Sequence, residues 1–179
     1  MQKIYLVRHG KTEWNNRGIT QGLTDIPLSL EGADDAKILA KQMDLSKIDI
    51  CISSPLSRAY ETAKIICQDK LDIIIDEKLK ERCYGNYEGK KIEFEKVKKY
   101  WDYKLDLKDE DVESIKNCLK RAKEFLEDIR VKYPDKNLFI VTHGAFMKAL
   151  HFNLIGYDCD TDFMSFFPQN TTIYEYNNN

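Results

Sequence analysis

The chain has 179 residues, of which 42% are hydrophobic and 32% are charged, and its formal net charge at pH 7 is -2. This length and composition are typical of one globular domain with a sizeable core. The small net charge excludes a general attraction to nucleic acids or anionic membranes, so an anion has to bind at a local site. Because no apolar run is long enough to span a bilayer, we expect no membrane partner.

The cysteine pattern indicates reduced thiols. Five cysteines, an odd number, lie far apart without a C-x-x-C pair or a neighbouring histidine cluster: Cys51, Cys67, Cys83, Cys118 and Cys159. Such thiols are typical of reducing compartments, where they are mostly structural. We therefore expect a cytoplasmic protein, in which the sequon that begins at Asn170 stays unmodified.

Apolar runs with strand and helix periodicity alternate along the chain. Residues 3–7 predict a strand, and Ser29 is placed to cap a helix over residues 30–43. The later predicted elements are a strand at 49–53, a helix at 56–67, a strand at 71–75, a long helix with an apolar face from Val112 to Ile129, a strand at 138–141, a helix at 145–154 and a strand at 171–176. This alternation predicts a mostly parallel sheet covered on both faces, a three-layer α/β/α sandwich. Since no linker divides the chain, residues 1–179 are predicted to form one domain.

One segment departs from this pattern. Residues 90–111 contain seven lysines and seven acidic residues, with Phe94, Val97, Tyr100 and Trp101 interleaved. Charge runs of this kind usually form a solvated helix with one apolar stripe. Long segments between the main elements of a compact domain are also often functional. A lid or small cap segment over an active site is therefore an equally good interpretation of residues 90–111.

Two strands end in the same kind of motif. Residues 4–7 run into Arg8-His9-Gly10, and residues 138–141 run into Thr142-His143-Gly144. Ligands of open α/β sheets bind outside the carboxyl ends of the strands, so parallel strands would bring the two histidines together. Each glycine permits a sharp turn and a close approach of phosphate to the backbone. One His-Gly after a strand is often only a surface turn, but its repetition favours an anion site.

Arg58 is the third part of the predicted site. It follows the strand at 49–53 within Ser53-Ser54-Pro55-Leu56-Ser57-Arg58-Ala59, where the proline favours a helix start. Arg58 then falls in the first helical turn, which attracts anions, and its guanidinium provides a bidentate clamp for phosphate. His151 lies mid-helix without a glycine turn, and we interpret it as structural.

These motifs resemble those of the histidine phosphatase superfamily, the phosphoglycerate mutase-like proteins. The resemblance covers nearly the whole chain, and the motifs in this order and spacing are highly specific for the family. It extends to Thr12-Glu13-Trp14-Asn15, Gln21-Gly22, Asp25-Ile26-Pro27-Leu28-Ser29, Glu31-Gly32, Leu79-Lys80-Glu81 and Gly85-Asn86-Tyr87-Glu88-Gly89. It implies the phosphoglycerate mutase-like α/β fold and phosphoryl transfer through a phosphohistidine.

The resemblance also implies a role for each site residue. The implied roles are His9 as the phosphorylated nucleophile, Glu81 as the general acid, Arg8, Arg58 and His143 as ligands of the transferring phosphoryl group, and Asn15, Gln21, Gly22 and Gly144 as the rest of the phosphate pocket. The chemistry fits, because neutral imidazole can attack phosphorus and the charge on the equatorial oxygens needs fixed cations. Glu81 has to carry a proton when substrate binds, which the negative charge of the phosphate would favour.

Other phosphate chemistries fit the sequence less well. Six residues separate Cys51 from Arg58, one more than the Cys-x5-Arg loop of cysteine phosphatases requires. Asp158-Cys159-Asp160 follows a helix end rather than the buried strand that an aspartyl phosphatase needs, and no Gly-x4-Gly-Lys-Ser/Thr loop occurs. We therefore predict no metal ion and no cofactor.

The predicted function is a metal-independent phosphomonoesterase acting on a small-molecule phosphate ester through a phosphohistidine. Phosphoglycerate mutase-type transfer is the alternative. The resemblance disfavours it, because the mutases of the family have a larger insertion between the acid and the second histidine, and Gln21-Gly22 is more similar to the phosphatases. A non-catalytic phospholigand-binding protein is less favoured, because every reactive side chain is present. The ester stays open among phosphosugars, phosphoglycerates, nucleotides and α-ribazole phosphate. Lys11 and Tyr87 depart from the family pattern and are predicted to alter the substrate entrance.

Overall fold

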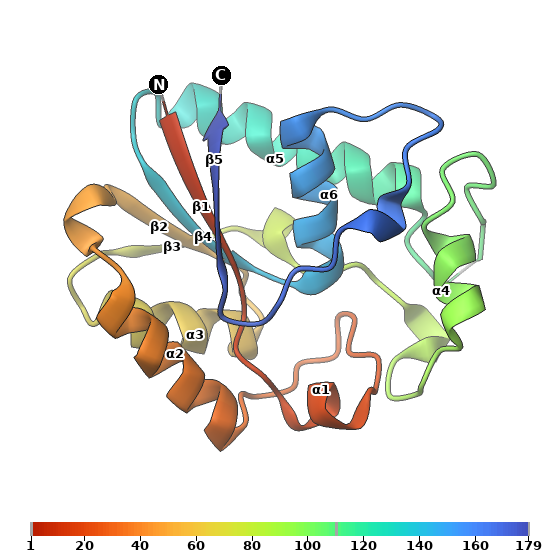
Figure 1. The fold of residues 1–179 in the computed structure, drawn as a ribbon, viewed down its shortest axis with the longest axis horizontal. Helices are drawn as coiled ribbons and strands as arrows, with labels where there is room; N and C mark the ends of the chain where they lie inside the picture. The colour runs from red at the N-terminus through yellow and green to blue at the C-terminus, as the bar shows by residue number, and fades with distance from the viewer. Residues whose placement is uncertain (1, 110, 179) are drawn as a thin grey trace.

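The structure is built on one five-stranded sheet. The computed structural model describes residues 2–109 and 111–178, and within them the strand order is β3-β2-β4-β1-β5. In chain order the strands are β1 (Gln2–Arg8), β2 (Ile50–Ser53), β3 (Ile73–Ile75), β4 (Leu138–Thr142) and β5 (Ile173–Asn178) (Figure 1). The first four strands pair in parallel, and β5 runs antiparallel to β1. The predicted mostly parallel sheet is confirmed.

Helices cover both faces of this sheet. Helices α2 (Leu30–Gln42) and α3 (Ser57–Cys67) share one apolar cluster with the sheet, and α5 (Ile115–Lys132) and α6 (Gly144–Ile155) share another. Figure 1 shows these pairs on opposite sides of the strands. The three-layer α/β/α architecture is therefore confirmed. In the part of the chain that the structure describes, no helix is long and apolar enough to cross a membrane.

Side-chain caps account for where several helices begin. Ser29 accepts a hydrogen bond from the first turn of α2, as predicted, and Ser114 does the same for α5. Val112, which the apolar pattern placed in the long helix, therefore lies just before it. Thr12 caps a short helix, α1 (Glu13–Arg17), that hydrophobic periodicity did not predict because it has no buried residue. Single turns of 3-10 helix occur at Leu45–Lys47, Glu77–Leu79, Gly85–Tyr87 and Phe163–Ser165.

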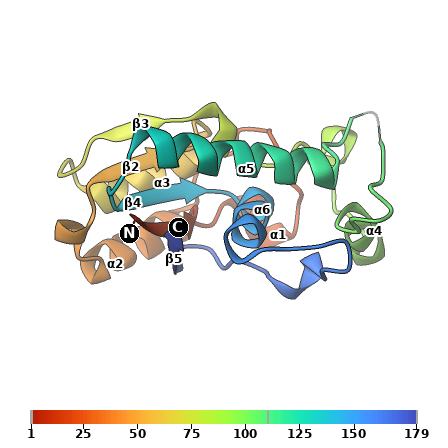
Figure 2. The ribbon, with the colours of Figure 1, turned by 90° about the horizontal axis from the view of Figure 1, so that it is seen from above.

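The charged segment at 90–111 contains one short helix, α4 (Phe94–Tyr100). Figure 2 shows α4 at the end of the molecule away from β2 and β3. Tyr100 and Trp101 are buried, whereas Phe94 is exposed. The segment therefore packs through Tyr100 and Trp101 at the C-terminal end of α4, and the predicted solvated helix accounts for α4 alone.

Candidate active site

A cavity of about 360 Å³ lies where β1, β2 and β4 end. The register explains its position, because Arg8 pairs with Thr142 across β1 and β4, and Ser53 pairs with Val141 across β2 and β4. The residues that follow these strands therefore meet at one edge of the sheet. Of the predicted site residues, the cavity wall contains Arg8, His9, Asn15, Gln21, Arg58, Glu81 and Gly144.

His9 is held as a neutral imidazole. Its Nδ1 lies 2.7 Å from the carbonyl oxygen of Gly10, which can only accept, so Nδ1 carries the proton and Nε2 keeps its lone pair. Burial, reinforced by the charges of Arg8 and Arg58, holds the pKa of His9 well below its ordinary value. At neutral pH the ring therefore has a free nucleophilic nitrogen.

Arg58 is the second residue of α3, and its guanidinium is fixed by three protein acceptors. Nε donates to Nδ1 of His143 at 3.2 Å, and Nη1 and Nη2 donate to the carbonyl oxygens of Thr24 at 2.9 Å and Gly22 at 2.7 Å. His143 accepts at Nδ1, so its proton is on Nε2, which donates to Oγ of Ser54 at 2.7 Å. Burial and the Arg58 charge hold the pKa of His143 well below its ordinary value. His143 thus orients Arg58, and its own contact with phosphate stays a prediction.

Arg8 supplies the second guanidinium of the cavity. Its Nη1 donates to the carbonyl oxygen of Pro168 at 3.0 Å, and its buried Nε has no hydrogen-bond partner among the described residues. A Cβ at Gly144 would lie 3.2 Å from Cζ of Arg8. Glycine at this position leaves space for the guanidinium beside the start of α6.

The glycines of the two strand-end motifs do not adopt the left-handed backbone conformation. Neither Gly10 nor Gly144 has a positive φ among the described backbone angles. A Cβ at Gly10 would lie 2.6 Å from the carbonyl oxygen of Gly32 in α2. Close packing against α2 therefore leaves no room for a side chain at Gly10, and the predicted approach of phosphate to its backbone stays a prediction.

Thr12 orients two amide side chains of the pocket. Its backbone N–H donates to Oδ1 of Asn15 at 3.1 Å, and its hydroxyl donates to Oε1 of Gln21 at 3.0 Å. Both amide oxygens are thereby occupied, which leaves the NH2 groups available to a ligand in the cavity. Thr12 is buried and was not predicted as a site residue, although the capping pattern Thr12 to Asn15 is visible in the sequence.

Glu88 holds together the loop that carries Gly22. Its carboxylate accepts from the backbone N–H groups of Leu23 at 2.9 Å, Thr24 at 2.8 Å and Tyr84 at 3.1 Å. Gly22 has a φ of 54°, and a Cβ there would lie 2.0 Å from the Glu88 carboxylate. Glu88 therefore positions Gly22, whose carbonyl oxygen accepts a hydrogen bond from Arg58. Glu88 was part of the quoted motif at residues 85–89, but the sequence did not predict this role.

The Glu81 carboxylate faces the N-terminus of α6. Oε1 accepts from the backbone N–H groups of Arg82 at 2.8 Å and Phe146 at 2.9 Å, and Oε2 accepts from that of Ala145 at 3.1 Å. These donors and the helix dipole orient the carboxyl group at the cavity wall. Oε2 accepts only one N–H, so it is the oxygen with capacity to hold a proton.

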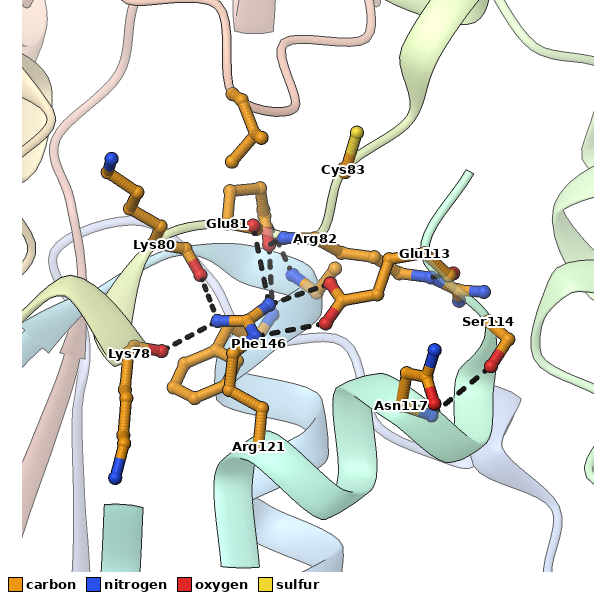
Figure 3. Close-up of polar contacts among 12 residues, drawn as sticks. Lys78, Lys80, Glu81, Arg82, Cys83, Glu113, Ser114, Asn117, Arg121 and Phe146 are labelled. Carbon is orange, nitrogen blue, oxygen red and sulfur yellow. Dashed lines mark hydrogen bonds and ion pairs between the residues drawn. The ribbon is translucent and has the colours of Figure 1, made fainter. Parts of the chain in front are cut away.

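Arg121 of α5 braces the backbone that carries Glu81 (Figure 3). Its Nη1 donates to the carbonyl oxygens of Lys78 at 2.6 Å and Lys80 at 2.7 Å, and its Nε and Nη2 bind the Glu113 carboxylate at 2.9 and 2.7 Å. Cζ also lies 4.1 Å from the ring centroid of Phe146. The sequence showed Arg121 only as a polar residue within the long helix.

The cavity is also lined by residues outside the predicted phosphate site, and one of them, Trp101, belongs to the segment at 90–111 that was interpreted as a lid or cap. Trp101 of the charged segment, Lys148 of α6 and Phe167 of the C-terminal loop all line the cavity. Lys11 instead pairs with Glu31 outside the cavity. Lys11 does not line the cavity, and its predicted effect on the substrate entrance stays a prediction.

No cluster of metal-binding side chains occurs in residues 2–109 and 111–178. Three or more His, Cys, Asp or Glu side chains are nowhere grouped there as ligands for an ion. The charged groups that converge on the cavity are cationic, apart from Glu81. The arrangement is suited to an anion.

Comparison with known protein families identifies one match over nearly the whole chain. The profile of the histidine phosphatase superfamily (branch 1) matches residues 4–178. That range includes every side chain of the cavity described above. The reactive groups on the wall are therefore part of the matched sequence.

Known relatives include phosphatases and a mutase. A putative phosphoserine phosphatase 2 from Hydrogenobacter thermophilus is 36% identical over 165 residues, which cover 87% of this chain and 80% of the relative. A phosphoglycerate mutase from Schizosaccharomyces pombe is 31% identical over 168 residues, which cover 86% of this chain and 79% of the mutase. The crystal structure of a phosphoserine phosphatase from Entamoeba histolytica in complex with 3-phosphoglyceric acid has 34% identity and a TM-score of 0.81, covering 98% of this chain and 90% of that one.

Proposed function

Since the chain belongs to the histidine phosphatase superfamily, we propose that it hydrolyses a small phosphate monoester without a metal ion, through phosphorylated His9. The observation that carries this proposal is the buried neutral ring of His9, with Nε2 unprotonated, beside Arg8 and Arg58. Relatives named phosphoserine phosphatase support hydrolysis of a small ester. The five free cysteines support a cytoplasmic location.

In the first step, Nε2 of His9 attacks phosphorus as the ester P–O bond breaks. The proton of Glu81 passes to the leaving alkoxide, which departs as a neutral alcohol. Arg8 and Arg58 stabilise the charge on the equatorial oxygens, and the amide groups of Asn15 and Gln21 donate to the same oxygens. The product is a phosphohistidine and an ionised Glu81.

In the second step, water attacks the phosphohistidine. Glu81 takes a proton from the water as the new O–P bond forms and the N–P bond breaks. Inorganic phosphate leaves, and His9 returns to its neutral form with the proton on Nδ1. The two N–H donors of Oε1 keep Glu81 in place while Oε2 gives and takes the proton.

Mutase activity is the second candidate, and the relative named phosphoglycerate mutase favours it. The two reactions share the phosphohistidine and differ in its acceptor, which is water in one and a substrate hydroxyl in the other. A bisphosphoglycerate primer added to 3-phosphoglycerate separates them. Net release of phosphate supports hydrolysis, and isomerisation without release supports transfer.

The experiment that tests the proposal is an assay of phosphate monoesters in the presence of chelator. The panel contains p-nitrophenyl phosphate, O-phosphoserine, 3-phosphoglycerate, a sugar phosphate and α-ribazole phosphate. We expect turnover and an acid-labile, alkali-stable phosphoenzyme, both abolished by His9→Ala. His151→Asn is the matched control, because His151 lies outside the cavity and binds the Tyr176 hydroxyl. A metal requirement, or a phosphoenzyme in His9→Ala, would contradict the proposal.

A further inference from the structure

Lys148 is a buried cation to which the proposed hydrolysis assigns no role. It lies in α6, is only 4% exposed, and lines the cavity. Its Nζ lies 4.6 Å from the ring centroid of Trp101, 4.2 Å from that of Phe167 and 3.8 Å from Sδ of Met164. Aromatic rings hold an ammonium group in place without neutralising its charge.

A lysine this deeply buried normally has an acidic partner, because loss of water penalises the charged form. Among residues 2–109 and 111–178, no carboxylate forms an ion pair with Lys148. Glu81 and Asp162 act on it only at longer range, and the Glu81 carboxylate hydrogen-bonds to backbone N–H groups of α6 instead. Burial, with the nearby charge of Arg82, lowers the pKa of Lys148 to about 8. The ammonium is therefore mostly charged at neutral pH, and it has no acidic partner among the residues that the structure describes.

Arg82 adds a second positive charge behind the same wall. Its Cζ lies 4.7 Å from the ring centroid of Trp101, so this indole contacts both Arg82 and Lys148. Its Nε donates to the Glu113 carbonyl oxygen at 2.8 Å, whereas Nη1 and Nη2 have no hydrogen-bond partner among the described residues. Lys148 and Arg82 thus add positive charge to that of Arg8 and Arg58.

Lys148 lies in the same cavity as the predicted phosphate pocket, about one helical turn from Gly144. Gly144 and Lys148 are four residues apart in α6, so both face the cavity, separated by about 6 Å along the helix axis. We propose that Lys148 binds a carboxylate of the substrate, and that the preferred esters are phosphates of small hydroxy acids. A carboxylate fits better than a second phosphate, because one ammonium balances a single negative charge, whereas a phosphate monoester carries nearly two at neutral pH. This inference rests on the proposed function, which places the phosphate at Arg8 and Arg58.

The test compares two esters that differ only at the relevant group. 3-Phosphoglycerate carries a carboxylate where glycerol 3-phosphate carries a hydroxymethyl group. We expect the wild type to prefer 3-phosphoglycerate, and Lys148→Met to reduce the ratio of the two kcat/KM values by about 10- to 100-fold. Lys148→Arg keeps a positive charge and should retain part of the preference. Lys120→Met, at an exposed position of α5, should leave the ratio unchanged.

Measurements of binding and of thermal stability test the role of Lys148 without relying on turnover. In a His9→Ala background, calorimetry should show that Lys148→Met weakens binding of 3-phosphoglycerate more than that of glycerol 3-phosphate. Loss of all turnover in the wild type would contradict the proposed function, while these binding data would still decide the role of Lys148. Lys148→Met should not lower Tm, since it removes an unpaired buried charge. Equal effects on both esters in kinetics and binding would overturn the inference, as would a lower Tm with an unchanged ratio.

Discussion

Arg58 and His143 lie 85 positions apart in the chain and share a hydrogen bond of 3.2 Å between Nε and Nδ1. This contact joins the start of α3 to the end of β4. Because His143 is neutral, it fixes the guanidinium without neutralising it, as a carboxylate would. Arg58 therefore keeps its full positive charge for a phosphate in the cavity.

Arg58→Lys should lower kcat/KM for p-nitrophenyl phosphate by about 100- to 1000-fold, the range found when a fixed transition-state donor is lost. An ammonium cannot reproduce the three donor contacts that fix Arg58, and it lacks the planar fork that matches phosphate. Steady-state kinetics measure the effect. Arg17→Lys is the matched control, because Arg17 is exposed on α1. A loss below about threefold in Arg58→Lys would contradict the assigned role.

Thr12→Val should lower kcat/KM by about tenfold, because the hydroxyl that orients the Gln21 amide and caps α1 is lost. Stability should fall by about 1 kcal/mol with the cap. Ser114→Ala is the matched control, since it removes the cap of α5 at a residue outside the cavity wall. Both variants should unfold at lower urea concentration, and only Thr12→Val should lose activity. Equal activity in the two would show that Thr12 acts through stability alone.

Glu81→Gln should have an effect that depends on the leaving group. For an alkyl phosphate, kcat should fall by about 100- to 10,000-fold, because the alkoxide needs a proton. For p-nitrophenyl phosphate the first step should change little, because nitrophenolate leaves without one. Burst kinetics separate this step from hydrolysis of the phosphoenzyme. Glu124→Gln, on α5, is the control. The same loss with both esters in the first step would exclude Glu81 as the general acid.

The stability of the fold should fall as the pH is lowered below the ordinary histidine value. His9 and His143 both have their pKa held well below 6.5 by burial, so the unfolded chain binds protons that the folded chain does not. Above pH 6.5 the two rings do not lower the free energy of unfolding. Below pH 6.5 each ring lowers the free energy of unfolding by up to about 1.4 kcal/mol per pH unit. Urea unfolding between about pH 7.5 and about pH 5 measures this change.

His9→Gln isolates one of the two rings in that measurement. As the pH falls, the wild type should lose stability faster than this variant. The difference in unfolding free energy between them should change by up to about 1.4 kcal/mol per pH unit. The carboxylates titrate in both proteins, so their contribution cancels in the difference. A pH-independent difference would show that His9 is not held neutral in the folded state.

Local patterns in the sequence were sufficient for the architecture and for most of the reactive groups. Helix and strand periodicity predicted the layers, because one side of each element has to be apolar to be buried. The motifs at residues 8–10 and 142–144 both follow strands, so parallel pairing alone brings them to one edge of the sheet. Arg58 followed from the same rule. Glu81 depended on the resemblance to a family, since the strand-to-loop context and the glycine-aromatic run after it are weak signals for a glutamate between Lys80 and Arg82.

The tertiary structure decided what these groups can do. The proton positions of His9 and His143 depend on the carbonyl or side chain that each ring nitrogen meets, and for His143 those partners lie 85 and 89 positions away. The contacts of Glu81 with α6 span 64 and 65 positions. Lys148 is an ordinary lysine in the sequence, and only the burial of its helix face places its charge in the cavity wall. Periodicity identifies which face is buried, but protonation and charge compensation depend on contacts between residues far apart in the chain.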